Sequence, residues 1–304
     1  ENMEMVKAII QAAEELKAPV MIQTTPSTIK YGTLETYQAI VAAEAAKASV
    51  PVCLHLDHGS SFDLAMKALK AGYTSVMIDG SKLDYEGNIE VSKKVADVAA
   101  SMGIPCEAEL GKVGGKEDDL VAVADTNTDP QEAREFVERT GCDSLAIAIG
   151  TSHGAYKFTR KPDGEILAID VIEKIHKVLP NTHMVMHGSS SVPQELQDLI
   201  NAYGGAIPQT YGVPVEEIVR GIKSGVRKVN VDTDCRMAIT GAIRKIFAEN
   251  PKEFDPRKYL KPAIEEMQKV CEARYIAFGA AGHADKIKVI PMSVMAKRYA
   301  DGEI

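Results

Sequence analysis

Three of the seven histidines directly follow short apolar runs, and each of these three precedes a glycine: His58, His153 and His187. In a parallel α/β barrel the turns at the carboxyl ends of the strands meet on one rim. Three imidazoles on three such turns can therefore converge on one point. Three nitrogen ligands with one open position are the composition of a catalytic zinc site. A single histidine would more often be a surface or hydrogen-bonded residue, but the three together predict a metal centre.

Carboxylates occupy the same strand ends. Asp57 directly precedes His58, Glu109 closes a buried run, and Asp232 follows the last apolar run. Glu117 lies in a glycine-rich turn that we expect to be mobile, so it could close over a bound substrate. A carboxylate beside a metal-bound carbonyl can move protons to and from carbon and oxygen. These positions predict general acid–base chemistry next to the metal.

Two further turns predict phosphate binding. Residues 188–190 and residues 230–233 follow the last two apolar runs, where barrels often hold a phosphate. Three basic side chains, Lys157, Arg236 and Arg257, could bind a second phosphate through charge-assisted hydrogen bonds. The chain carries a net charge of -8, so a polyanionic substrate would need such local positive charge.

The elements that must position these turns alternate along the chain. Strand-like apolar runs span residues 20–24, 50–56, 74–78, 104–108, 144–149, 183–186 and 226–231. Helical periodicity follows at residues 4–16, 34–48, 62–71, 89–102, 131–140, 168–178 and 215–224. This alternation predicts a parallel sheet of βαβ units. An eighth strand would close a (β/α)8 TIM barrel, and we expect the first strand to be missing from this chain.

The C-terminal region has a different pattern. Residues 235–250 and 261–278 are long helical stretches joined by a proline-containing linker, and a last helix lies near residues 293–299. We interpret residues 235–304 as including a helical extension of one barrel domain that spans residues 1–304.

Composition narrows the class of protein. The acidic balance, with a pI near 5.5, argues against a nucleic-acid or membrane-surface protein. Five cysteines without a CxxC pair argue against a disulfide framework and favour a cytoplasmic location. The sequence contains no apolar run of about 20 residues, so we expect no membrane-spanning helix.

Taken in order, the turns closely resemble those of class II fructose-bisphosphate aldolases. The matching motifs are His55-Leu-Asp57-His58-Gly59, Glu107-Ala-Glu109-Leu-Gly111, Gly114-Gly-Lys-Glu117-Asp118, Gly150-Thr-Ser-His153-Gly-Ala-Tyr-Lys157, His187-Gly-Ser-Ser190-Ser191 and Asn230-Val-Asp232-Thr233-Asp234-Cys-Arg236. The resemblance implies reversible cleavage of fructose 1,6-bisphosphate to dihydroxyacetone phosphate and glyceraldehyde 3-phosphate, in glycolysis and gluconeogenesis.

The resemblance also implies roles for single residues. His58, His153 and His187 would hold one Zn²⁺, and Glu109 could contact it after moving inward. Asp57 would exchange a proton with the C4 hydroxyl, and Glu117 would carry the proton at the dihydroxyacetone-phosphate carbon. The first phosphate and its triose would be surrounded by Gly154, Gly188, Ser190, Asn230 and Thr233, with a Na⁺ or K⁺ ion nearby.

The residues expected at the second phosphate distinguish two candidate substrates, fructose 1,6-bisphosphate and tagatose 1,6-bisphosphate. Tagatose 1,6-bisphosphate differs from the fructose compound only at C4. By resemblance Asp232 would contact the sugar hydroxyls, while Arg236 and Arg257 would grip the second phosphate, which favours fructose. Arg257 would reach a neighbouring subunit, which implies a homodimer or homotetramer.

Two alternatives belong to other functional classes. A metal-dependent hydrolase on the same barrel often begins with a His-x-His pair, whereas His55 and His58 are three residues apart and would face opposite sides of a strand. A non-catalytic phosphosugar-binding protein would not need both Asp57 and Glu117 beside three metal ligands.

Overall fold

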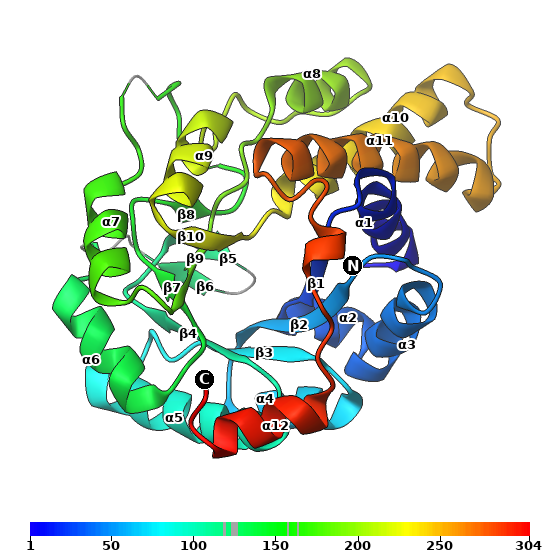
Figure 1. The fold of residues 1–304 in the computed structure, drawn as a ribbon. Coiled ribbons are helices and arrows are strands. Elements are labelled where there is room, and N and C mark those ends of the chain that lie inside the picture. Colours follow the sequence, from blue (N-terminus) through cyan, green and yellow to red (C-terminus); the bar gives the residue numbers. More distant parts are fainter. Residues whose placement is uncertain (118–119, 123–126, 157, 163) are drawn as a thin grey trace.

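The structure, a computed structural model, describes residues 1–117, 120–122, 127–156, 158–162 and 164–304; at 114–117 and 120–122 it describes the backbone alone. Lys157 and the side chain of Glu117, both predicted to act at the site, therefore lie outside the described part. The described chain has a central curved sheet with helices packed around its outer face (Figure 1).

Seven parallel strands form this sheet, in the order β1-β2-β3-β4-β7-β9-β10. They are β1 (Val20–Thr24), β2 (Val52–Gly59), β3 (Ser75–Ile78), β4 (Cys106–Leu110), β7 (Ser144–Ile147), β9 (His183–Met186) and β10 (Val226–Val229). The seven predicted strands are confirmed. Within the described residues no ladder joins β1 to β10, so the sheet is an open half-barrel of seven strands. This agrees with the expectation that one strand of the barrel is missing from the chain, and the closed eight-stranded barrel stays a prediction.

A small second sheet lies at the carboxyl ends of the main strands. It contains β5 (Gly114–Glu117), β6 (Leu120–Ala122) and β8 (Ser152–His153), in the order β6-β5-β8. The parallel pairing of β5 with β8 brings the backbone of the predicted mobile turn beside His153. The sequence analysis did not anticipate this sheet, because its strands are short and rich in glycine.

Helices follow the strands as the periodicity predicted. They are α1 (Met3–Leu16), α2 (Pro26–Gly32), α3 (Leu34–Ala45), α4 (Phe62–Ala71), α5 (Tyr85–Ser101), α6 (Pro130–Thr140), α7 (Ile169–Val178), α8 (Gln194–Ala202) and α9 (Val215–Ser224). Local signals fix their ends: the Ser61 side chain accepts a hydrogen bond from the backbone of Leu64, and Gly72 ends α4 at φ 96°. The predictions for α4 and α9 match the observed bounds. Helices α2 and α8 were not predicted.

Strand alternation divides the core into an outer and an inner layer. On β4, Cys106 and Ala108 pack outward against helices, so Glu107 and Glu109 face the inside of the sheet. Among the described residues, one inner apolar cluster contains Met77, Ala146 and Val185. Buried polar side chains, among them Glu107 and Glu109, belong to the same inner layer, which supports the site.

The three predicted C-terminal helices are observed as α10 (Thr233–Glu249), α11 (Pro256–Ala277) and α12 (Met292–Ala300), with the short 3₁₀ turn η1 (Ala284–Lys286). Helix α11 begins at Pro256, within the predicted linker and before the predicted start at residue 261. Helices α10 and α11 pack with α1 through a cluster that includes Met5, Cys235 and Met267 (Figure 1). Helix α12 packs instead on α5, and the Tyr299 hydroxyl donates to Asp143 at 2.6 Å. In the described part of the chain, no helix combines the length and apolar character needed to cross a membrane.

Candidate active site

The three predicted histidines meet at the carboxyl ends of the strands. The ring centroids of His58 lie 5.1 Å from His153 and 4.5 Å from His187, and those of His153 and His187 are 5.8 Å apart. One ring nitrogen from each lies within 4.8 Å of the other two. Three imidazoles at this spacing fit a divalent metal ion.

The backbone at the end of β2 explains how Asp57 and His58 share the site. Successive strand residues face opposite sides, so a regular strand would turn His58 outward. His58 instead has φ 48°, in the left-handed region that non-glycine residues seldom adopt. This turn places the His58 ring beside His187 while Asp57 also faces inward.

Two carboxylates lie close to the His58 and His187 rings. Asp79 Oδ2 lies 3.1 Å from His58 Nδ1, and Glu109 Oε2 lies 3.3 Å from His187 Nδ1 and 3.9 Å from His58 Nδ1. Burial opposes the charge of Asp79, but hydrogen bonding to His58 outweighs it and holds the pKa of Asp79 well below its usual value. The sequence analysis missed Asp79, whose signal was its position at the end of β3.

Glu107 forms a second layer beneath the three histidines. Its Oε1 lies 3.0 Å from His187 Nε2, and its Oε2 lies 2.9 Å from Lys228 Nζ and 3.6 Å from His55 Nε2. In the neutral ring, a hydrogen bond donated by His187 Nε2 to Glu107 leaves Nδ1 with the lone pair, on the side of the histidine cluster. A metal ion bound at this cluster would therefore meet Nδ1 of His187.

Burial and charge separate the pKa values of the two deeper histidines. Burial and the nearby Lys228 lower the pKa of His55 to about 3, so its ring is neutral. Burial and the His58 ring oppose charge on His187 as well, but Glu107, Glu109 and Asp57 outweigh them and raise its pKa to about 9. Burial also opposes charge on Glu107, but Lys228 and the histidines hold its pKa well below the usual range. The pocket thus concentrates negative charge where a cation would bind.

Replacing Lys228 with methionine tests this inner layer. The Lys228→Met chain would bury the Glu107 carboxylate without its cation, so we expect the free energy of unfolding to fall by about 3 kcal/mol. Lys93→Met is the matched control, because it breaks an exposed pair with Asp97 and should cost less than about 1 kcal/mol. Urea unfolding measures the free energy of unfolding of both variants. Equal losses in the two variants would contradict a stabilising role for the buried pair of Lys228 and Glu107.

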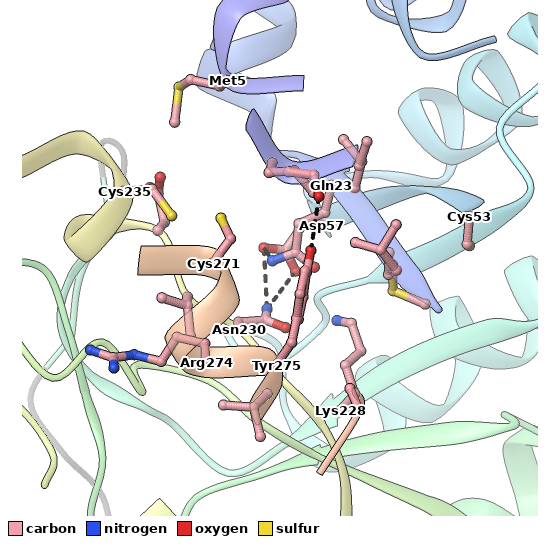
Figure 2. A pocket seen from close by; sticks show the side chains of 18 of the residues that line it. Met5, Gln23, Cys53, Asp57, Lys228, Asn230, Cys235, Cys271, Arg274 and Tyr275 are labelled. Carbon is pink, nitrogen blue, oxygen red and sulfur yellow. Dashed lines mark hydrogen bonds between the residues drawn. The ribbon is translucent and has the colours of Figure 1, made fainter. Parts of the chain in front are cut away.

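Asp57 lies beside the cluster and is almost fully buried, with 2% of its surface exposed. Gln23 Nε2 donates to Asp57 Oδ2 at 3.0 Å, and Asn230 Nδ2 donates to Oδ1 at 3.2 Å (Figure 2). Both donors fix the carboxylate toward a cavity of about 1020 Å³ that these residues line. Gln23 was not predicted; its signal was its place on the inner face of β1.

The predicted phosphate-binding residues line the same cavity. They are Gly154, Gly188, Ser190, Asn230 and Thr233. Gly188 has φ 61°, and a Cβ there would stand 2.6 Å from the carbonyl group of Ser152. Ser190 Oγ accepts a hydrogen bond from the backbone of Asp232 at 3.2 Å. Thr233 begins α10, whose N-terminal N–H groups favour an anion.

Substituting Gly188 with alanine should distort this turn. The positive φ alone costs about 1–3 kcal/mol of stability, and the contact with Ser152 adds to it. We expect Gly188→Ala to melt at a lower temperature and to bind phosphate more weakly. Gly164→Ala is the control, since nothing lies within 4 Å of its added Cβ. Calorimetry should separate the two variants, and identical behaviour would show that Gly188 is not constrained.

The predicted second-phosphate residues are only partly assembled. Arg236 lines the cavity and pairs with Asp232 at 2.6 Å and with Glu1 at 2.7 Å. Arg257 is 89% exposed at its side chain and pairs with Asp255, and the described cavity lining does not include it. The structure therefore does not bring Arg257 to the site within one chain.

The sequence profile of the family described as Fructose-bisphosphate aldolase class-II matches residues 1–283. This chain belongs to that family. The class II aldolase is 52% identical to "Fructose-bisphosphate aldolase 2" of Cereibacter sphaeroides, over 100% of this chain and 91% of that protein. It is 51% identical to the "Fructose-bisphosphate aldolase" of Nostoc sp. (strain PCC 7120 / SAG 25.82 / UTEX 2576), over 100% and 90%.

Solved structures agree with this assignment. The crystal structure of the YdjI aldolase from Escherichia coli K12 has a TM-score of 0.75 at 30% identity, over 93% of this chain and 90% of that one. A structure titled as a putative fructose-1,6-biphosphate aldolase from Coccidioides immitis has a TM-score of 0.73 at 28% identity, over 94% and 91%. Family membership makes the chain a lyase and implies a divalent metal. It argues against the hydrolase and the non-catalytic alternatives.

Proposed function

We propose that this class II aldolase reversibly cleaves fructose 1,6-bisphosphate to dihydroxyacetone phosphate and glyceraldehyde 3-phosphate, as in glycolysis and gluconeogenesis. The observation that carries the proposal is the buried Asp57 carboxylate, which lines the cavity with His153, beside the three converging imidazoles. Curated relatives near 50% identity carry the name of this enzyme.

His58, His153 and His187 would hold a zinc ion, with Glu109 beside His187 as a further oxygen ligand. When bound, the metal supplies Lewis-acid stabilisation of the negative charge that develops on substrate oxygens. This chemistry removes the need for a lysine Schiff base. Asp79 and Glu107 orient the histidine rings from behind.

Asp57 accepts the proton of the C4 hydroxyl as the C3–C4 bond breaks, and returns it in the condensation direction. Gln23 and Asn230 hold its two oxygens, so the carboxylate does not rotate away from the substrate. Glu117 carries the proton at the dihydroxyacetone-phosphate carbon. The pairing of β5 with β8 supports this assignment, because it brings the Glu117 segment next to His153.

Gly154, Gly188, Ser190, Asn230 and Thr233 bind the first phosphate and its triose, with a Na⁺ or K⁺ ion nearby, and Asp232 contacts the sugar hydroxyls. Lys157, Arg236 and Arg257 bind the second phosphate. Because Arg257 is exposed and does not line the cavity of its own chain, it acts from a neighbouring subunit of a homodimer or homotetramer.

The chain is proposed to form one barrel domain over residues 1–304, with residues 235–304 including the helical extension. In the complete (β/α)8 barrel an eighth strand would pair with the open edges of β1 and β10. The five free cysteines support a cytoplasmic enzyme.

Metal restoration tests the proposed reaction. We expect a chelator to abolish triose-phosphate release from fructose 1,6-bisphosphate, and Zn²⁺ to restore it. Treatment with borohydride in the presence of substrate should leave activity unchanged. Activity that survives the chelator, or that borohydride destroys, would contradict metal-based cleavage.

A further inference from the structure

A buried ion pair lies behind the two turns that carry the proposed phosphate-binding residues. Asp234, in the first turn of α10, is fully buried at 0% exposure. Arg274 on α11 donates from Nη2 to Asp234 Oδ2 at 2.9 Å, and its side chain is 13% exposed. Arg274 also lines the cavity together with Asp57 and Asn230 (Figure 2).

The Asp234 carboxylate also holds the neighbouring turn through its backbone. It accepts the N–H of Ser191 at 3.2 Å and the N–H of Val192 at 2.8 Å. Val192 has φ 49°, a conformation that a β-branched residue rarely adopts and that surrounding contacts must enforce. One carboxylate therefore fixes the strained end of the 188–192 turn.

The same contacts join both phosphate turns into one unit. Ser190 precedes the two residues that Asp234 binds, and its hydroxyl accepts a hydrogen bond from the backbone of Asp232. Thr233 directly precedes Asp234 in the chain. A displacement of Asp234 would thus move Ser190 and Thr233 together, and anion binding requires donors held in fixed positions.

Charge explains why Asp234 needs Arg274. A carboxylate this close to a phosphate site would repel the ligand through a medium of low dielectric constant. The guanidinium of Arg274 neutralises that charge while leaving the carboxylate oxygens available to the two N–H groups.

We propose that Asp234 and Arg274 are positioning residues for the phosphate group bound between the 188–192 turn and the start of α10. Neither residue needs to touch the substrate. The inference rests on the proposed function, since it assumes a phosphorylated substrate in this cavity. The proposal gives a role to α11, because this helix carries Arg274. Through Arg274, the helical extension would affect the phosphate affinity of its own subunit.

The test compares variants of the full zinc-loaded chain. Asp234→Asn keeps the size of the side chain and removes its charge, and Arg274→Met removes the cation. We expect each to raise KM for fructose 1,6-bisphosphate at least about tenfold, with kcat within about threefold of wild type and metal content unchanged. Arg274→Lys should recover part of the affinity. Glu266→Gln is the control, because it breaks an exposed ion pair with Lys269 on the same helix.

Binding of inorganic phosphate, followed by calorimetry on the same proteins, separates this inference from the proposed reaction. We expect phosphate affinity to fall in Asp234→Asn and Arg274→Met by the same factor as 1/KM. If melting temperature falls while KM and phosphate affinity stay at wild-type values, the pair has only a structural role and the inference is wrong. If Asp234→Asn does not fold, the comparison of Arg274→Met with Arg274→Lys gives the same decision. A wild-type chain that binds phosphate without cleaving the sugar would contradict the reaction instead.

Discussion

The Asp57→Asn chain, fully loaded with zinc, is expected to cleave fructose 1,6-bisphosphate at least about a thousandfold more slowly than wild type. The asparagine preserves the volume of a side chain that is 2% exposed, but it cannot accept the C4 hydroxyl proton. The amide oxygen of the asparagine can accept from one of the two neighbours, Gln23 or Asn230, and the other neighbour can accept from its NH2 group after an amide flip, so the cavity should keep its shape. Steady-state kinetics with metal analysis measures the effect.

A surface carboxylate provides the control for Asp57. Asp63 lies in the first turn of α4 and pairs with Lys67 in solvent, so Asp63→Asn should leave kcat unchanged. Turnover of Asp57→Asn near the wild-type rate, with metal bound, would show that another group accepts the proton.

The second large effect is expected at His187. Changing even the residues that hydrogen-bond a metal ligand typically weakens metal binding by about 10- to 100-fold, so loss of a ligand should exceed about a hundredfold. His187→Ala would also leave Glu107 and Glu109 facing each other without the ring between them. We expect the purified variant to hold little metal and to show no measurable cleavage.

His183 offers a control on the same strand. It opens β9 and is exposed, so His183→Ala should keep both metal and activity. Elemental analysis measures the bound metal and the cleavage assay measures activity. Circular dichroism checks that each variant folds. A His187→Ala chain that retains one metal per subunit would remove His187 from the ligand set.

The sequence could predict the convergence of the three histidines because it depends on topology alone. Each follows a parallel strand, and parallel strands in one sheet end on the same side. The precise orientation of His58 could not be predicted, since strand alternation would have turned it outward. Only the positive φ at that residue brings it into the site.

The inner polar layer was harder to find from the sequence. Glu107 and Lys228 lie in the short strands β4 and β10, and their partners are distant along the chain. Two glutamates spaced by two residues within a buried strand were the available signal, because charged residues are rarely buried unless paired. His55 lies inside β2 and contacts Ser75 at 2.8 Å.

Some predicted residues depend on parts of the assembly beyond one described chain. Arg257 is exposed on α11, and no intrachain contact brings it to the cavity within the described residues. Its role at a neighbouring subunit therefore stays a prediction. The roles of Lys157 and Glu117 also stay predictions, as do the monovalent cation and the choice of zinc.

Triose-phosphate release from fructose 1,6-bisphosphate and from tagatose 1,6-bisphosphate, each with and without a chelator, tests the central claim most directly. We predict cleavage that favours the fructose compound and that disappears with the chelator. A preference for tagatose would preserve the metal site and the mechanism but contradict the roles given to Asp232, Arg236 and Arg257. Failure of the zinc-loaded protein to cleave either sugar would contradict the proposed function itself.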